Sequence, residues 1–186
     1  FLPERMKLDL ASQQATVAPD DTLNIAVKGA YLYGAPAAGN QLLGVAVFER
    51  QKNPLAQKLP GFEFGDANEE SRRERVELEQ NVLDENGNLE LAVDLSPAQG
   101  KRSPYTVRTT LSLLESGGRP VVRNFERVIW PVPVLVGVRP LFTGDYAREG
   151  SVAQFEVIRA NADGKLHAGK GLPVRLFREN RDYYWR

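Results

Sequence analysis

One turn-rich segment, with an alternating strand pattern on each side, limits the fold most strongly. Residues 23–28 alternate apolar with polar or small side chains, which predicts a β-strand with one buried face. Residues 43–48 alternate again, with 43, 45 and 47 on one face and 44, 46 and 48 on the other. Between them, Tyr31–Gly39 contains two glycines and a proline, which favour turns over strands. This connector is compatible with an ordinary loop or with a crossing between two sheets.

The same period-two pattern recurs along the first 131 residues, and no segment has convincing helical periodicity. Asp84–Asn88 has Asn-Gly at its centre, a strong hairpin signal, and Ser116–Pro120 predicts another hairpin. We therefore predict an all-β fold, an antiparallel immunoglobulin-like β-sandwich of roughly seven strands. Besides the two strands above, the predicted strands are 6–10 (extended past a bend by 14–17), 75–83, 89–93, 105–113 and 121–130.

A long polar segment, residues 51–70, interrupts the strand pattern. It is about 20 residues long and is punctuated by proline and glycine, which is unusual within a compact domain. The sequence allows two interpretations, an excursion with a role of its own and a mobile loop. Its composition favours the mobile loop.

A domain boundary is predicted at Trp130–Pro133, because its two prolines cannot donate to a sheet ladder. The strand pattern then starts again at an offset of about 130 residues. We therefore predict residues 1–131 as a complete sandwich and residues 132–186 as the first strands of a truncated second copy. A few strands cannot enclose a core, so this copy needs cover from a longer array or from another molecule. The offset aligns Met6 and Leu8 with Val136 and Val138, Ile25 and Val27 with Phe155 and Val157, and, one residue shorter, Val45, Val47 and Phe48 with Val174, Leu176 and Phe177.

Composition excludes several classes of function. The 24 basic and 24 acidic side chains give a net charge of zero, so nothing favours nucleic acid as a partner. No apolar run is long enough to insert this segment into a membrane. Cysteine is absent, which removes disulfides, thiol nucleophiles and cysteine-based zinc sites but leaves the compartment open.

Two C-terminal features have residue types that occur in chemical sites. His167 is the only histidine, so we interpret it as a solvated hairpin residue rather than a zinc ligand or a triad base. Gly164–Gly171 is one residue away from a phosphate-binding P-loop, but Gly171 stands where the motif has Ser or Thr. The preceding residues, Asn161–Gly164, predict a turn instead.

Three other groups of residues are also interpreted as structural rather than chemical. Asp84, Asn86 and Asn88 have the spacing of calcium-loop oxygens without the glycine and glutamate of that loop, which favours a hairpin turn. Residues 69–77 mix Glu and Arg, which predicts a solvated strand edge rather than paired catalytic carboxylates. Tyr183–Trp185 are interpreted as core residues of the second domain, with a partner-binding surface as the alternative. We thus predict no catalytic, cofactor-binding or metal-binding residues and no enzyme activity.

The connector carries a resemblance to a known family. Tyr31-Leu32-Tyr33-Gly34-Ala35-Pro36-Ala37-Ala38-Gly39, followed by an apolar strand, resembles the crossing Tyr-x-Tyr-Gly-x-Pro-x-x-Gly of alpha-2-macroglobulin family proteins. The bacterial branch is the most similar, judged also by Phe1-Leu2-Pro3 and by the run Arg178–Arg186. The resemblance covers the first domain whole and the second in part, and it implies macroglobulin-like sandwiches.

The resemblance also implies a function, that of a broad-spectrum protease inhibitor. In this family a protease cuts an exposed bait segment, the array of domains rearranges, and the protease is enclosed; many members also capture it through a Cys-Gln thioester. The partners implied are neighbouring domains of the same parent chain, and proteases through bait and thioester regions outside these residues. The second domain is a candidate for the one that carries the bait insertion. The implied location is the periplasm, with the parent anchored to the inner membrane by a lipidated N-terminal cysteine outside this segment.

Two other functions are compatible with a β-sandwich. One is a tandem immunoglobulin-like module of a cell-surface adhesion protein, and the other is an accessory β-domain of a secreted carbohydrate enzyme. For the inhibitor, we predict rigid sandwiches with a proline-stiffened joint at Trp130–Pro133.

Overall fold

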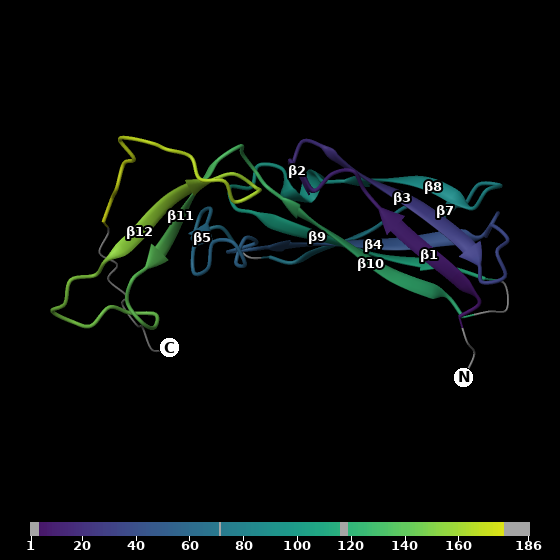
Figure 1. Ribbon diagram of the computed structural model, residues 1–186, viewed down its shortest axis with the longest axis horizontal. Helices are drawn as coiled ribbons and strands as arrows, with labels where there is room; N and C mark the ends of the chain where they lie inside the picture. The colour runs from purple at the N-terminus through teal and green to yellow at the C-terminus, as the bar shows by residue number, and fades with distance from the viewer. Residues whose placement is uncertain (1–3, 71, 116–118, 177–186) are drawn as a thin grey trace, which may run out of the picture.

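The computed structural model describes residues 4–70, 72–115 and 119–176, which form three β-sheets and no α-helix. Two sheets stack face to face, and the third lies at the other end of an elongated molecule (Figure 1). No helix in this described part is long and apolar enough to cross a membrane. The elements are β1 (Met6–Ala11), β2 (Thr16–Val17), β3 (Thr22–Tyr31), β4 (Gln41–Arg50), β5 (Glu63–Phe64), β6 (Glu74–Glu77), β7 (Asn81–Val82), β8 (Asn88–Asp94), a 3-10 turn η1 (Ser96–Ala98), β9 (Tyr105–Leu113), β10 (Val121–Ile129), β11 (Leu135–Pro140) and β12 (Phe155–Ala160).

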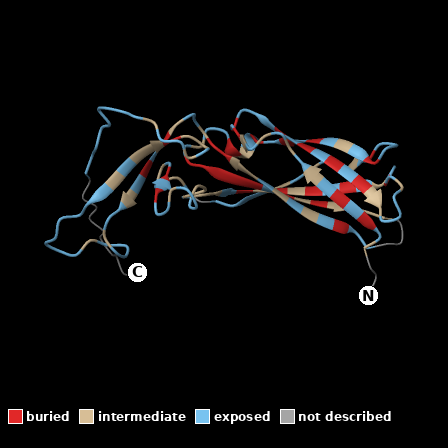
Figure 2. Ribbon diagram, viewed as in Figure 1, coloured by how far each residue is buried: buried red, intermediate tan, exposed pale blue. Residues whose placement is uncertain are grey.

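The predicted sandwich is confirmed. One sheet has the order β1-β3-β8, and the facing sheet has the order β2-β10-β9-β4-β6, with β7 also paired to β4. Alternate residues of each strand point into the space between the sheets, so buried and exposed residues alternate along the ribbons in Figure 2. In β4 the core-facing set is Leu42, Gly44, Ala46 and Phe48, while Leu43 points outward.

The connector Tyr31–Gly39 is a crossing between the two sheets rather than a loop within one. It joins β3 in the first sheet to β4 in the second. The Tyr31 N–H donates to the carbonyl oxygen of Ala35 at 2.8 Å, and the Gly34 N–H donates to that of Tyr31 at 2.9 Å. Gly34 has φ of 101°, a conformation that favours glycine.

Several strand predictions were wrong in detail. Residues 75–83 form two short strands, β6 and β7, interrupted at 78–80, and both pair with β4. Residues 14–17 do not extend β1; β2 joins the opposite sheet, parallel to β10, so the pairing is not wholly antiparallel. Counting β1 with β2 and β6 with β7 as interrupted strands restores the roughly seven strands that were expected.

The Asn-Gly segment Asp84–Asn88 is a turn but not a hairpin. It connects β7, which pairs with β4, to β8, which pairs with β3 in the other sheet. Gly87 has φ of 75°, and a Cβ placed there would lie 2.3 Å from the carbonyl oxygen of Gly29. The Gly29 N–H in turn donates to the Gly87 carbonyl at 2.8 Å. Glycine is therefore required here for its conformation and for the close approach of two backbones.

The third sheet has the order β12-β11-β5 and overturns the interpretation of residues 51–70 as a mobile loop. This segment contributes β5, whose Phe64 and Glu63 pair with Gly137 and Val138 of β11. The excursion therefore has a structural role, because it supplies one strand of a sheet that lies beyond Trp130.

The second copy begins as expected but does not continue in the same way. β11 and β12 lie where the offset placed them and pair antiparallel, as β1 and β3 do. The expected strand near Val174 was wrong for residues 174–176, where Val174 and Leu176 are 87% and 99% exposed. These side chains have no described surface to pack against, so burial does not favour a strand. Phe177, Tyr183–Trp185, Phe1–Pro3 and the centre of the predicted Ser116–Pro120 hairpin lie outside the described residues.

Replacing Gly87 with alanine should destabilise the sandwich more than the same change at Gly39. Both residues have a similar positive φ, 75° and 73°, but nothing lies within 4 Å of a Cβ at Gly39. The conformation alone costs about 1–2 kcal/mol, and the clash at Gly87 should add about 1–3 kcal/mol. Urea denaturation of the two variants measures the difference, and equal losses would contradict the close backbone approach.

Candidate functional site

His167 lies in the turn region after β12, but it is half-buried rather than solvated. Its backbone N–H donates to the carbonyl oxygen of Arg159 at 2.9 Å. Its Nε2 is buried and has no hydrogen-bond partner among the described residues. Among all the residues that the structure describes, no three histidine, cysteine, aspartate or glutamate side chains are grouped so that they could hold a metal ion.

The P-loop-like segment follows a turn, as predicted. The Asn161 side chain closes that turn by accepting hydrogen bonds from the N–H groups of Asp163 at 3.1 Å and Lys165 at 2.9 Å. Residues 164–171 contain no helix, so no helix N-terminus directs its N–H groups at a phosphate.

Asp84, whose spacing resembled that of a calcium loop, stabilises the turn between β7 and β8. Oδ1 of Asp84 accepts hydrogen bonds from the N–H groups of Asn86 at 2.9 Å and Asn88 at 2.8 Å. This is an Asx-type turn, in which the carboxylate takes the place of a backbone acceptor.

The charged run 69–77 divides into two parts. Glu74, Arg75 and Glu77 lie on the exposed edge strand β6, where Arg75 and Glu77 form an ion pair at 2.8 Å, so the solvated edge is confirmed there. Glu69 was wrongly included, because it lies before β6 and its carboxylate binds backbone N–H groups of another loop.

The candidate site is the junction between the sandwich and the β11–β12 hairpin, and its main element is the segment 51–70, here called the strap. The strap leaves the sandwich after β4, turns through residues 54–61, forms β5 against β11, and returns toward β6. The Phe64 N–H also donates to the Lys52 carbonyl at 2.8 Å, so β5 is hydrogen-bonded to the start of the strap.

A second hydrophobic core, separate from that of the sandwich, lies at this junction. The strap, the chain link and the hairpin all contribute to it. Phe64 is 1% exposed, and its ring centroid lies 5.4 Å from that of Trp130 at a tilt of 58°. A Cβ on Gly137 would lie 2.6 Å from the Phe64 ring, so glycine allows the ring to contact the β11 backbone. The buried members are Phe62, Phe64, Trp130, Leu135 and Ala160, with Leu55, Leu59, Val128, Ile158 and Ala162 packed around them.

Polar contacts join the same elements. The Arg139 guanidinium of β11 donates to the Pro60 carbonyl at 3.1 Å and lies 4.5 Å from the Phe62 ring centroid. Its other side forms an ion pair with Glu156 of β12. Lys58 Nζ donates to the carbonyl of Asp163, beyond β12, at 2.7 Å.

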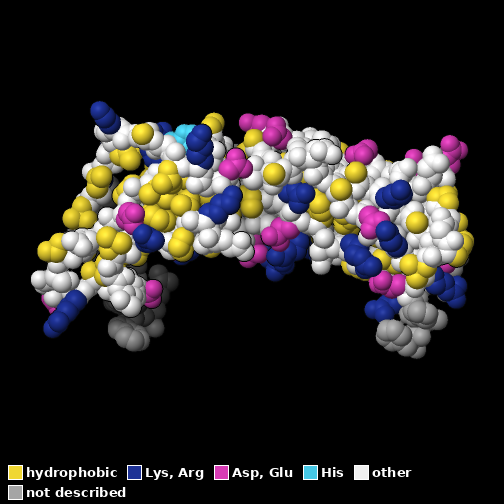
Figure 3. All heavy atoms as spheres, in the orientation of Figure 1, with side chains coloured by type: hydrophobic (Ala, Val, Ile, Leu, Met, Phe, Trp, Pro, Cys, Tyr) yellow, Lys and Arg dark blue, Asp and Glu magenta, His cyan; other side chains and the backbone are white. Residues whose placement is uncertain are grey.

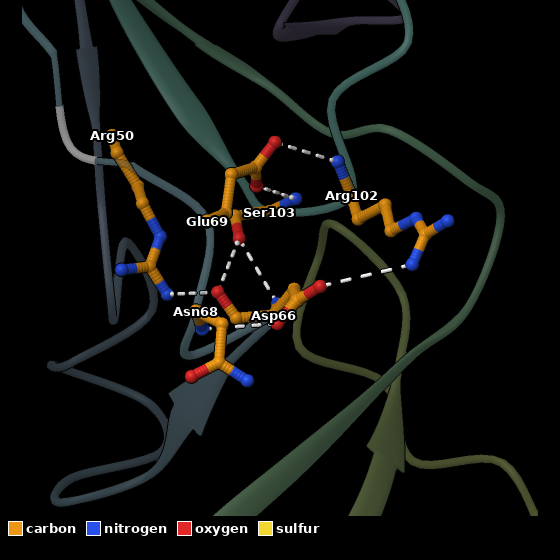
Figure 4. Close-up of polar contacts among 6 residues, drawn as sticks. All are labelled: Arg50, Asp66, Asn68, Glu69, Arg102 and Ser103. Carbon is orange, nitrogen blue, oxygen red and sulfur yellow. Dashed lines mark hydrogen bonds and ion pairs between the residues drawn. The ribbon is translucent and has the colours of Figure 1, made fainter.

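The other end of the strap is fastened to the sandwich by a polar network (Figure 4). The Glu69 carboxylate accepts from the N–H groups of Arg102 at 3.1 Å and Ser103 at 2.8 Å. The Asp66 N–H donates to the Ser103 hydroxyl at 3.0 Å, and the Asp66 carbonyl accepts from Arg50 at 2.8 Å. Burial, and then the Glu69 charge, raise the pKa of the nearby Tyr105 hydroxyl, which has no described partner.

The outer face of the hairpin is apolar and open. Val136, Val138, Phe155 and Val157 are between 39% and 55% exposed, and hydrophobic side chains gather over β11 and β12 in Figure 3. The opposite face is covered by residues 51–70, so part of the cover that was expected from a longer array or another molecule comes from this chain itself.

The arrangement suits a mechanical role. The junction holds packed aromatic rings and hydrogen-bonded loops that join the strap to the hairpin and to the sandwich. Sequence reasoning missed this junction, although one signal was present: Phe62 and Phe64 alternate between Gly61 and Gly65 inside a largely polar segment.

Comparison with known proteins supplies the family. The model described as "Bacterial Alpha-2-macroglobulin MG5 domain" matches residues 4–131, and the one described as "Bacterial macroglobulin domain 6" matches residues 137–186. Alpha-2-macroglobulin of Escherichia coli K12 is 42% identical over 199 aligned positions, covering 100% of this chain and 12% of the relative. That of Xylella fastidiosa is 42% identical over 187 positions, covering 100% of this chain and 11% of the relative.

Solved structures agree with these matches. The native conformation of E. coli alpha-2-macroglobulin superimposes with a TM-score of 0.71 at 38% identity, over 89% of this chain and 11% of that one. The E. coli protein activated by porcine elastase gives a TM-score of 0.74 at 42% identity, over 88% of this chain and 15% of that one. This chain therefore spans only about an eighth of the curated relatives that it matches. It belongs to the bacterial alpha-2-macroglobulin family, and its residues 4–131 match the MG5 domain of that family.

Proposed function

We propose that this chain is a non-catalytic, load-bearing segment of a bacterial protease inhibitor that encloses its target after a bait segment is cut. The observation that carries the proposal is the match of consecutive parts of the chain to two consecutive macroglobulin domains. Its support is that E. coli relatives have been solved as trypsin-activated and elastase-activated alpha-2-macroglobulin. The family favours this function over the adhesion module and over the accessory domain of a carbohydrate enzyme.

The role of these residues in the proposed function is to transmit movement. The sandwich core packs tightly between two sheets, so the sandwich moves as a body rather than deforming. The strap and the link at Trp130–Pro133 connect that body to the next domain. In this proposal, the predicted domains 1–131 and 132–186 are the two bodies that the strap and the link connect. Bait cleavage and covalent capture would take place elsewhere in the parent protein.

The complete protein that carries this segment should enclose trypsin or elastase after cleavage. If the protease is enclosed, a small chromogenic peptide should still reach it and be cleaved, whereas a large protein substrate should not, so most activity on the large substrate should be lost. Paired assays with the two substrates measure this, together with small-angle scattering before and after cleavage. Equal activity on both substrates, with no change in shape, would refute the inhibitor function.

We also propose a periplasmic location for the parent protein, anchored to the inner membrane by a lipidated N-terminus. The support is the bacterial family assignment. Fractionation of cells that express the complete protein should recover it with inner membranes, and protease added to spheroplasts should cleave it. Recovery in the cytosol, protected from that protease, would overturn the location.

A further inference from the structure

We infer that the strap locks the sandwich and the β11–β12 hairpin into one rigid unit, so that the proline-rich link at Trp130–Pro133 is not a free hinge. The inference concerns how these two parts are joined, and it holds or fails whether or not the parent traps proteases. Its evidence is that the strap is fastened at both ends, to the hairpin by β5 and to the sandwich by Glu69 and Asp66.

The attachment to the hairpin combines three kinds of contact. β5 adds a third strand beside β11, the Phe64 ring packs on Gly137, and Arg139 of β11 binds the Pro60 carbonyl. The contact of Lys58 with the Asp163 carbonyl, 2.7 Å, adds a point beyond β12. These contacts are spread along the hairpin, so they oppose both its rotation and its translation relative to the strap.

The attachment to the sandwich has little freedom of its own. The Glu69 carboxylate accepts two backbone hydrogen bonds, which are stronger than bonds between neutral groups. Ser103 is 1% exposed, and a Cβ on Gly65 would lie 2.5 Å from the Ser103 Cα, so the two loops are in direct backbone contact. Arg50, in the last position of β4, holds the Asp66 carbonyl from within the sheet.

Two attachments have a different mechanical effect from one. A short link between two bodies leaves rotation about its backbone bonds, even where prolines narrow their range. The Trp130 N–H is already bonded to the Val17 carbonyl at 2.9 Å, which fixes the start of the link. A second, separate attachment through the strap removes the remaining rotation. If the proposed trapping movement takes place, which rests on the proposed function, it should therefore pivot outside this junction.

Spin-label distances in the full 186-residue chain test the lock directly. The chain contains no cysteine, so Ala26→Cys on β3 and Val157→Cys on β12 can be labelled selectively. We expect one narrow distance distribution in the parent chain and an equally narrow one after Pro131→Gly with Pro133→Gly. Adding Glu69→Gln to the glycine variant should broaden the distribution, because it weakens the charged acceptor that holds the Arg102 and Ser103 N–H groups while the link is already flexible.

Three further variants distinguish loss of the lock from simple unfolding. Phe64→Ala removes the ring from Gly137 and should broaden the distribution, whereas Phe155→Ala, on the open face of the same hairpin, should not. Glu79→Gln, on an exposed carboxylate between β6 and β7, is the matched control for Glu69→Gln. Hydrogen exchange should increase about tenfold at both β5 and β11 in Glu69→Gln.

Two results would overturn the inference. One is broadening by the glycine replacements alone, which would make the link the hinge. The other is an unchanged width in both Phe64→Ala and the combined Glu69→Gln variant, with exchange increased only in the loops around Glu69 and Ser103.

Discussion

The contact between the Phe64 ring and the backbone of Gly137 determines how the two parts of this chain are joined. An isolated two-stranded hairpin is marginally stable in water, and β11 with β12 would be such a hairpin. β5 turns it into a three-stranded sheet, and Phe62 and Phe64 give it a core. The order of the hairpin therefore depends on β5 (Glu63–Phe64), which precedes β11 (Leu135–Pro140) by about 70 residues.

The two hydrophobic cores differ in how many separate segments of the chain each one needs. The sandwich core lies between two sheets whose residues all come from the first 129 positions, so it needs nothing from the rest of the chain. The junction core draws on the strap, the link and the hairpin together, and none of the three could form it alone. In an array of domains, a shared core of this kind ties two neighbours together.

The sequence was informative wherever a strand is long and one of its faces is buried. Burial alternates along β3 and β4 and, from Val107 onward, along β9, and each strand was expected close to its observed position. Two-residue strands leave no such signal. β5 and β2 are each defined by a pairing partner far along the chain, β11 and β10, and neither partnership is visible in local periodicity. The Asn-Gly turn was found but its topology was not, because the same turn can join strands of one sheet or of two.

The candidate site was missed for a related reason. Residues 51–70 are largely polar, and a judgement from overall composition gives no weight to the positions of Phe62 and Phe64, which form the second core. Their burial depends on Trp130, Leu135 and Gly137, which become neighbours only when the third sheet forms. Conversely, the residues that looked chemical, such as Asp84 and Asn161, are used locally to close turns.

The central claim is that the strap is a fixed part of the third sheet, and solution NMR of the 186-residue chain tests it most directly. The account predicts strong nuclear Overhauser effects between the ring protons of Phe64 and the two α-protons of Gly137, because the ring lies in van der Waals contact with that backbone. It also predicts slow exchange of the Phe64 amide, which donates to Lys52. Absence of those cross-peaks, with rapid amide exchange throughout residues 51–70, would show a loop that does not join the sheet and would contradict the account.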